Sequence, residues 1–193
     1  MIYHYASEKL IDLMIKRRLA NNENRLFYIY CMERTLSQVG NLLLLFILGC
    51  VFKKIIETSV FIIFYSSLRR FSGGAHAKSH WKCIGTYIIM LSASIVLARF
   101  LFSLSAVVII VTSILVIAIF LVFRYAPVDC VNRRFDTGGL AQLRRWSRIL
   151  IIVQSCVILV TLFLFPYFAT IACLASLCQS ITLLPVFNTM STS

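Results

Sequence analysis

Apolar residues along this chain gather into six long runs separated by short polar stretches. The runs extend from Leu36 to Phe52, Ile55 to Leu68, Ile84 to Leu101, Leu104 to Phe123, Ile149 to Phe165 and Ala169 to Phe187. A helix needs about 20 mostly apolar residues to cross a bilayer. The pattern therefore predicts an all-α, polytopic membrane protein with about six transmembrane or re-entrant helical segments.

The second run is the shortest, with 14 residues. It can cross a bilayer if Lys53 and Lys54 snorkel at one end and Arg69 at the other. Otherwise it forms a re-entrant segment, which membranes tolerate where protein or a water-filled cavity covers the irregular backbone. The sequence leaves both alternatives open.

The first 35 residues follow a different pattern. Apolar residues recur at helical spacing in two pieces, residues 10–18 and 26–33, with Asn21-Asn22 between them. This pattern predicts amphipathic helices in the headgroup region, or a helical hairpin packed on the rest of the protein. Six Lys/Arg and four Asp/Glu within this stretch argue against a cleavable signal peptide.

Composition supports the membrane class. Of the 193 residues, 60% are hydrophobic and 13% are charged, whereas soluble domains have about 45–50% apolar and about 25% charged residues. The length suits a single membrane domain over residues 1–193. It comprises interfacial helices in residues 1–35, a helical bundle in residues 36–187 and a short tail in residues 188–193.

The distribution of Lys and Arg predicts the orientation. Sixteen of the nineteen cations lie in the first 35 residues, in the 69–82 loop and in the 124–148 loop, and six spans place these regions on one side. The positive-inside rule makes that side cytoplasmic, together with both termini. Cytoplasmic loops facing anionic lipid headgroups account for the net charge of +12, so we expect no nucleic-acid partner.

The seven cysteines are an odd number, and most lie in apolar runs or on the predicted cytoplasmic side, which favours reduced thiols. Four of them are predicted to be small hydrophobic residues of the core, namely Cys50, Cys156, Cys173 and Cys178. Cys83 and Cys130 differ, because each lies at a membrane boundary among cations that favour a thiolate.

The segment Arg69–Cys83 reads RRFSGGAHAKSHWKC and combines imidazoles, a thiol and cations. On one straight helix His76 and Cys83 would lie roughly 10 Å apart along the axis, too far for proton transfer. Gly73-Gly74 permits a turn before His76, and a helix starting near Ser79 would place Cys83 in its first turns. There the helix dipole favours a thiolate, and an imidazole can accept its proton.

Other interpretations of this segment remain. His80 lies three residues before Cys83 and is a rival base on an ordinary helix. His76, His80 and Cys83 could also bind a metal, but Ala77 stands where an H-E-x-x-H motif has Glu. We therefore predict neither a metal nor a cofactor. A non-catalytic basic turn with histidines at the headgroup level is the structural alternative.

The order R-R-F-x-G-G-x-H-A, with a cysteine seven residues after the histidine, resembles the accessory gene regulator B family of bacterial membrane endopeptidases. The resemblance extends to the size, the six apolar runs, the basic N-terminal region and the Ala126–Asp129 stretch, and so covers essentially the whole chain. It places the protein in a bacterial cell membrane.

The resemblance implies a cysteine peptidase that matures a short amphipathic quorum-sensing pro-peptide. Cys83 would be the nucleophile and His76 the general base, while Arg70, Gly73 and Gly74 match positions that shape the site. The enzyme would cut near the C-terminal end of the precursor, retain the other part as a thioester, and release a thiolactone or lactone. Cys130 departs from the family pattern and is a second candidate reactive thiol.

A second basic loop could bind an acidic tail of the precursor through bidentate guanidinium–carboxylate pairs. Its arginines are Arg133, Arg134, Arg144, Arg145 and Arg148. Contact with lipid headgroups and fixing of the topology are the alternative role. Gly138-Gly139 interrupts this loop, so a partner could gather the cations on one face.

Two other functional classes remain at this point. A small transporter or channel would line its path with intramembrane charges such as Glu57 or Arg99, although both lie near predicted span ends. A non-catalytic scaffold would use the basic loops as docking surfaces. The apolar faces that small spans leave uncovered also suggest a homodimer.

Overall fold

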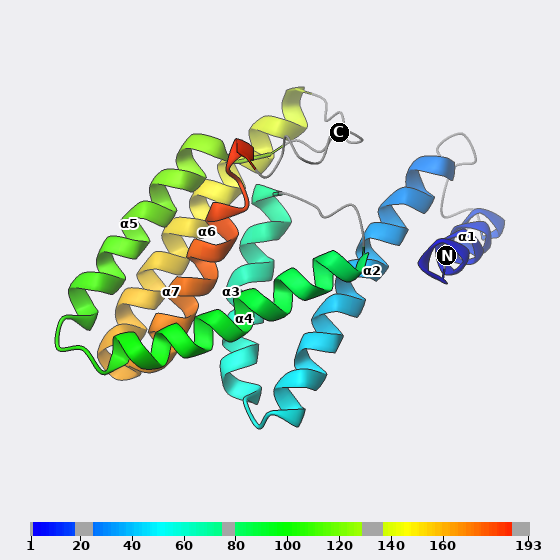
Figure 1. The fold of residues 1–193 in the computed structure, drawn as a ribbon. Helices are drawn as coiled ribbons and strands as arrows, with labels where there is room; N and C mark the ends of the chain where they lie inside the picture. Colours follow the sequence, from blue (N-terminus) through cyan, green and yellow to red (C-terminus); the bar gives the residue numbers. More distant parts are fainter. Residues whose placement is uncertain (1, 18–24, 75–79, 129–136, 187–193) are drawn as a thin grey trace. The chain divides into compact units, whose positions relative to one another are not determined.

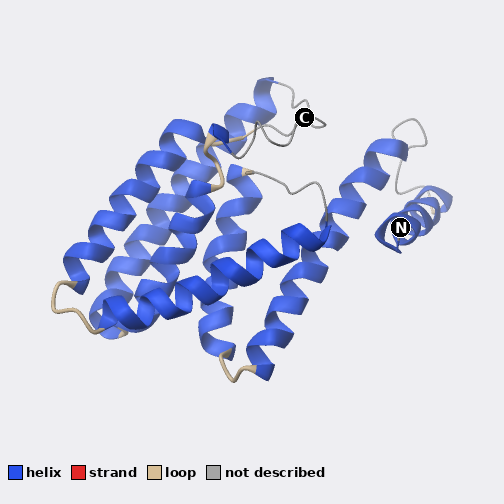
Figure 2. Cartoon of the chain, in the orientation of Figure 1, coloured by secondary structure: helices blue, strands red, loops and turns tan. Residues whose placement is uncertain are grey.

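The computed structural model describes residues 2–17, 25–74, 80–128 and 137–186, which are mostly α-helical (Figure 2). The helices are α1 (Ile2–Lys16), α2 (Arg25–Val51), α3 (Ile55–Ser72), α4 (His80–Phe102), α5 (Val107–Tyr125), α6 (Thr137–Leu164) and α7 (Pro166–Ile181). The predicted all-α fold is confirmed.

Four of these helices are long and apolar enough to cross a membrane. Their candidate spans are Cys31–Val51, Cys83–Phe102, Val107–Tyr125 and Gly139–Leu164. α7 is apolar but shorter, and α3 carries Glu57, Arg69 and Arg70 within its 18 residues. Large apolar side chains such as Phe120 and Phe163 are exposed on the long helices, as expected where lipid replaces water as the solvent.

The chain divides into two compact units, Met1–Leu48 and Gly49–Ser193. Within the first unit, Arg25 at the start of α2 forms an ion pair of 2.8 Å with Asp12 of α1. α2 is continuous across residue 35, so the amphipathic piece at residues 26–33 and the first apolar run form one helix rather than two elements.

In the second unit, α7 packs against α3, α4, α5 and α6 (Figure 1). Its residues 169–176 are all buried, so the helix is enclosed on every side. Ala, Ser and Cys predominate in this stretch, and small side chains let neighbouring helix backbones approach closely. Pro166 starts the helix at a position where its missing N–H leaves no intrahelical bond unmade.

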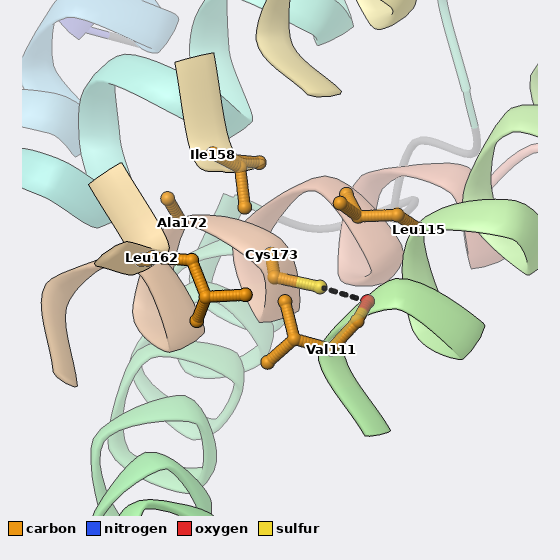
Figure 3. Close-up of a cluster of buried hydrophobic side chains, with 7 residues drawn as sticks. Val111, Leu115, Ile158, Leu162, Ala172 and Cys173 are labelled. Atoms are coloured by element: carbon orange, nitrogen blue, oxygen red, sulfur yellow. Dashed lines mark hydrogen bonds between the residues drawn. The ribbon is translucent and has the colours of Figure 1, made fainter. Parts of the chain in front are cut away.

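A hydrophobic cluster joins α5, α6 and α7 (Figure 3). Val111 and Leu115 of α5 face Ile158 and Leu162 of α6, each pair spaced by one helical turn. Cys173 of α7 lies between them, and its thiol donates a hydrogen bond of 3.6 Å to the Val111 carbonyl oxygen.

The four cysteines predicted for the core have different environments. Cys173 is buried, as predicted, and Cys178 is half-buried. Cys50 and Cys156 are exposed on the surfaces of apolar helices, so for them the prediction was wrong. Hydropathy places a cysteine in a membrane helix, but only the packing decides whether it faces protein or lipid.

Candidate active site

A two-glycine turn follows α3 and begins the site. Gly73 has φ 71° and Gly74 has φ 131°, both in the region that L-residues with a Cβ rarely adopt. The Gly73 N–H donates to the Arg69 carbonyl oxygen at 3.1 Å and so ends the helix. The turn expected at Gly73-Gly74 is therefore present.

The stretch after α5 pairs with this turn. The Val128 N–H donates to the Ser72 carbonyl oxygen at 3.0 Å, and Gly73 and Val128 form an isolated parallel β-bridge. A Cβ atom on Gly73 would lie 2.6 Å from the Val128 carbonyl oxygen, a distance that real Cβ atoms essentially never show. Val128 of the Ala126–Asp129 stretch singled out in the sequence thus lies beside the glycine turn, whereas Asp129 lies outside the described residues.

Gln179 of α7 holds the other side of the turn. Its Nε2 group donates to the Gly73 carbonyl oxygen at 2.7 Å and to Ser72 Oγ at 3.1 Å. Its Oε1 atom accepts a hydrogen bond of 3.4 Å from Arg69 Nη1. The Gln179 side chain is fully buried. Sequence reasoning missed this residue, although an amide inside an apolar run is a signal of internal polar contacts.

Arg69 points into the bundle and is only 7% exposed. Its Nη1 group also donates to the Tyr65 hydroxyl at 3.0 Å. The guanidinium carbon lies 5.8 Å from the ring centroids of both Tyr65 and Tyr87, within the range of cation–π attraction. Burial of a charge is costly without such partners, so these contacts stabilise the cation inside the protein.

Cys83 lies in the first turn of α4, as predicted, and is half-buried. Tyr87 follows one turn later on the same face of the helix. The Arg69 guanidinium carbon lies 5.8 Å from the Tyr87 ring centroid and so packs on the face of α4 that carries Cys83. The positive end of a helix dipole and a nearby fixed cation are both features that favour the thiolate form of a cysteine.

The two adjacent arginines of the motif have opposite environments. Arg70 is exposed, and its guanidinium carbon lies 6.0 Å from the Phe71 ring centroid. Arg69 is the one that contacts the interior. The role predicted for Arg70 stays a prediction, and the structure adds Arg69 to the candidate site.

The side chains of both candidate bases lie outside the part of the chain that the structure describes. His76 lies outside the described residues. His80 is the first residue of α4, but its side chain is also outside the description. The helix starts next to Ser79, where the sequence predicted a cap.

The second basic loop is described in part. Arg133, Arg134 and Cys130 lie outside the described residues. Arg144 and Arg145 are exposed on α6, whereas Arg148 donates to the Phe123 carbonyl oxygen at 3.3 Å and lies over the Phe123 ring. The loop was expected to be interrupted at Gly138-Gly139, but both residues lie in the first turn of α6.

This basic end of α6 lies beside the end of α3. Trp146 of α6 and Phe71 of α3 have ring centroids 6.2 Å apart. Trp146 is half exposed, and Arg145 precedes it. The contact brings an aromatic and basic surface close to the helix that carries Arg69.

The charges considered for a transport path lie at helix ends. Lys54 Nζ donates to Glu57 Oε1 at 2.7 Å across the start of α3. Arg99 is exposed in the last turn of α4. Both positions agree with the span ends expected from the sequence.

Comparisons with known proteins find the same family that the motif resembles. The model of the family described as accessory gene regulator B matches residues 7–183. Accessory gene regulator protein B of Staphylococcus aureus strain MRSA252 is 25% identical over 156 residues, which are 81% of this chain and 80% of that protein. No solved structure matches the chain.

Two relatives from Clostridium perfringens are matched over shorter regions. An AgrB-like protein of strain SM101 is 28% identical over 134 residues, which are 67% of this chain and 63% of that protein. AgrB-like protein 2 of strain 13 is 34% identical over 112 residues, or 56% and 51% of the two chains. The chain therefore spans between half and two thirds of the length of these relatives.

Proposed function

The chain belongs to the accessory gene regulator B family, and on this premise we propose that it is a membrane cysteine endopeptidase that processes a quorum-sensing pro-peptide. Cys83 is the nucleophile and His76 is the general base. The observation that carries the proposal is the position of Cys83, in the first turn of α4 and on the helix face where Tyr87 contacts the buried Arg69 guanidinium. Both features favour the thiolate that such a reaction needs.

The first step is acyl transfer to Cys83. The imidazole accepts the thiol proton, and the sulfur attacks the carbonyl carbon of a peptide bond near the C-terminal end of the precursor. The carbon–nitrogen bond then breaks, and the leaving amine takes the proton from the imidazolium. The N-terminal part of the precursor remains bound as a thioester.

The second step closes a ring. A thiol or hydroxyl within the retained peptide attacks the thioester carbonyl carbon, and the bond from that carbon to the Cys83 sulfur breaks. The proton of the attacking group returns through the imidazole to the Cys83 thiolate. The attacking group is held on the same bound peptide, so its effective concentration far exceeds that of an external nucleophile. The product is a thiolactone or lactone, and exclusion of water limits hydrolysis to a linear peptide.

The substrate and the membrane engage the basic end of the protein. Arg144 and Arg145 are exposed next to Trp146, which suits an acidic precursor tail or anionic lipid headgroups. Arg133 and Arg134 extend this charge along the sequence. In our proposal this end, the active-site loop and the N-terminus face the cytoplasm, and a homodimer covers part of the exposed apolar surface.

Trapping the acyl-enzyme tests the proposal. The protein is co-expressed with a precursor whose internal thiol or hydroxyl is replaced, quenched in acid and analysed by peptide mass spectrometry. We expect a thioester adduct on Cys83, lost on treatment with hydroxylamine. Cys83→Ala should abolish cleavage and leave membrane insertion intact, while Cys130→Ala should cleave normally. Processing by Cys83→Ala would exclude the mechanism.

The base is identified by two further variants. His76→Ala should abolish cleavage, because no group would then accept the thiol proton and return it to the leaving amine. His80→Ala should retain it. The reverse result would assign the base to His80.

A further inference from the structure

We propose that Gln179 is a positioning residue of the active site, because its side-chain amide binds both the glycine turn after α3 and the buried Arg69, whose guanidinium packs on Tyr87 one helical turn after Cys83. This inference rests on the proposed function and adds a residue outside the R-R-F-x-G-G-x-H-A motif. Gln179 lies on α7, more than a hundred residues after the turn that it contacts.

The hydrogen bonds of Gln179 use both ends of the amide. Nε2 donates its two protons to the Gly73 carbonyl oxygen and to Ser72 Oγ, at 2.7 and 3.1 Å. Oε1 accepts from Arg69 Nη1 at 3.4 Å. An amide has two donors and one acceptor oxygen, so this orientation satisfies the group in a place where no water reaches it.

The Gln179 hydrogen bonds connect two parts of the site whose relative position helix α3 alone does not fix. The Gly73 carbonyl lies beyond the end of α3 and sets where the chain leaves that helix. The Arg69 guanidinium lies one turn earlier, against the rings of both Tyr65 and Tyr87. One buried side chain of α7 therefore holds both the turn that precedes His76 in the sequence and the cation that packs on Tyr87, one helical turn after Cys83.

Steric contacts restrict the same region. A Cβ atom on Gly74 would lie 2.6 Å from Thr182 Oγ1 and 3.3 Å from Gln179 Nε2. The end of α7 thus packs directly on the glycine turn. Because the fit is tight, no larger polar side chain can take over the hydrogen bonds of the Gln179 amide without moving the turn.

The test measures the reactivity of Cys83 without any precursor. Full-length Gln179→Leu in membranes is treated with iodoacetamide at pH 7, and alkylation of the Cys83 peptide is followed by mass spectrometry. We expect the rate to fall at least about fivefold, since a less fixed Arg69 stabilises the thiolate less. In a cleavage assay we expect kcat to fall by about tenfold, with KM changed less than about twofold.

A matched control separates positioning from general damage to α7. Ser180 is also fully buried, and its hydroxyl donates within the helix to the Ser176 carbonyl oxygen at 2.8 Å. Ser180→Ala should alkylate and cleave at wild-type rates. The combined effect of Arg69→Gln and Gln179→Leu on the alkylation rate should be smaller than the product of the two single effects, because both variants remove the same Arg69–Gln179 contact.

Gln179→Asn provides a milder change if the leucine variant does not accumulate in the membrane. This change keeps the amide but shortens the side chain by one methylene, so slower alkylation of Cys83 is expected here too. A wild-type alkylation rate in either folded variant, or additive effects in the double variant, would overturn the inference. Absence of cleavage by the wild-type protein, with alkylation changed as expected, would instead count against the proposed peptidase.

Discussion

Gly73 and Val128 lie side by side in a parallel β-bridge, and the Val128 carbonyl oxygen occupies the space next to the missing Gly73 side chain. The bridge holds the chain after α5 against the turn that leads out of α3. A residue with a Cβ atom at position 73 would meet a main-chain oxygen, which cannot rotate away as a side chain can. Gly73 is thus required by this contact as well as by its φ of 71°.

Gly73→Ala should destabilise the protein by about 1–3 kcal/mol, because strain in the left-handed region adds to the steric contact. Thermal unfolding in detergent measures the change. Gly85→Ala is the matched control in α4, where an added Cβ meets no atom within 4 Å. There the better helix propensity of alanine should raise stability by up to about 1 kcal/mol. Equal melting temperatures for the two variants would contradict the packing at the turn.

The two adjacent arginines should differ in their effect on catalysis. Arg69→Gln removes a buried cation that packs on Tyr87, one helical turn after Cys83, so cleavage should fall by about tenfold or more. Arg70→Gln changes an exposed side chain and should have a smaller effect than Arg69→Gln. The measurement is precursor cleavage at equal membrane abundance of the two variants. Greater sensitivity at Arg70 would show that the exposed arginine binds the substrate or a lipid.

The proposed orientation predicts which loops a reagent reaches from outside the cell. Ser103→Cys, in the turn after α4, should react with a membrane-impermeant maleimide in intact cells. Arg145→Cys, exposed on α6, should react only after the membrane is permeabilised. Peptide mass spectrometry identifies the labelled residue in the presence of the native cysteines. Labelling of Arg145→Cys from outside would reverse the orientation.

The helical architecture followed closely from hydropathy. Each of the six apolar runs corresponds to a helix from α2 to α7, because a helix satisfies its own backbone hydrogen bonds in lipid and apolar residues are required along its length. The continuity of α2 could not be predicted from hydropathy, since an amphipathic segment and an apolar one can belong to one helix or to two. The burial of α7 could not be predicted from hydropathy either, because lipid and protein interiors select similar residues.

The sequence by itself determined the membrane class, the glycine turn and the start of α4 next to Cys83, since composition, backbone freedom and helix capping act over a few residues. The tertiary structure alone decided that Arg69 rather than Arg70 faces the interior, and that Val128 and Gln179 hold the turn. Those contacts join residues far apart in the chain. Their partners are chosen by how α3, α5 and α7 pack, which no local pattern encodes.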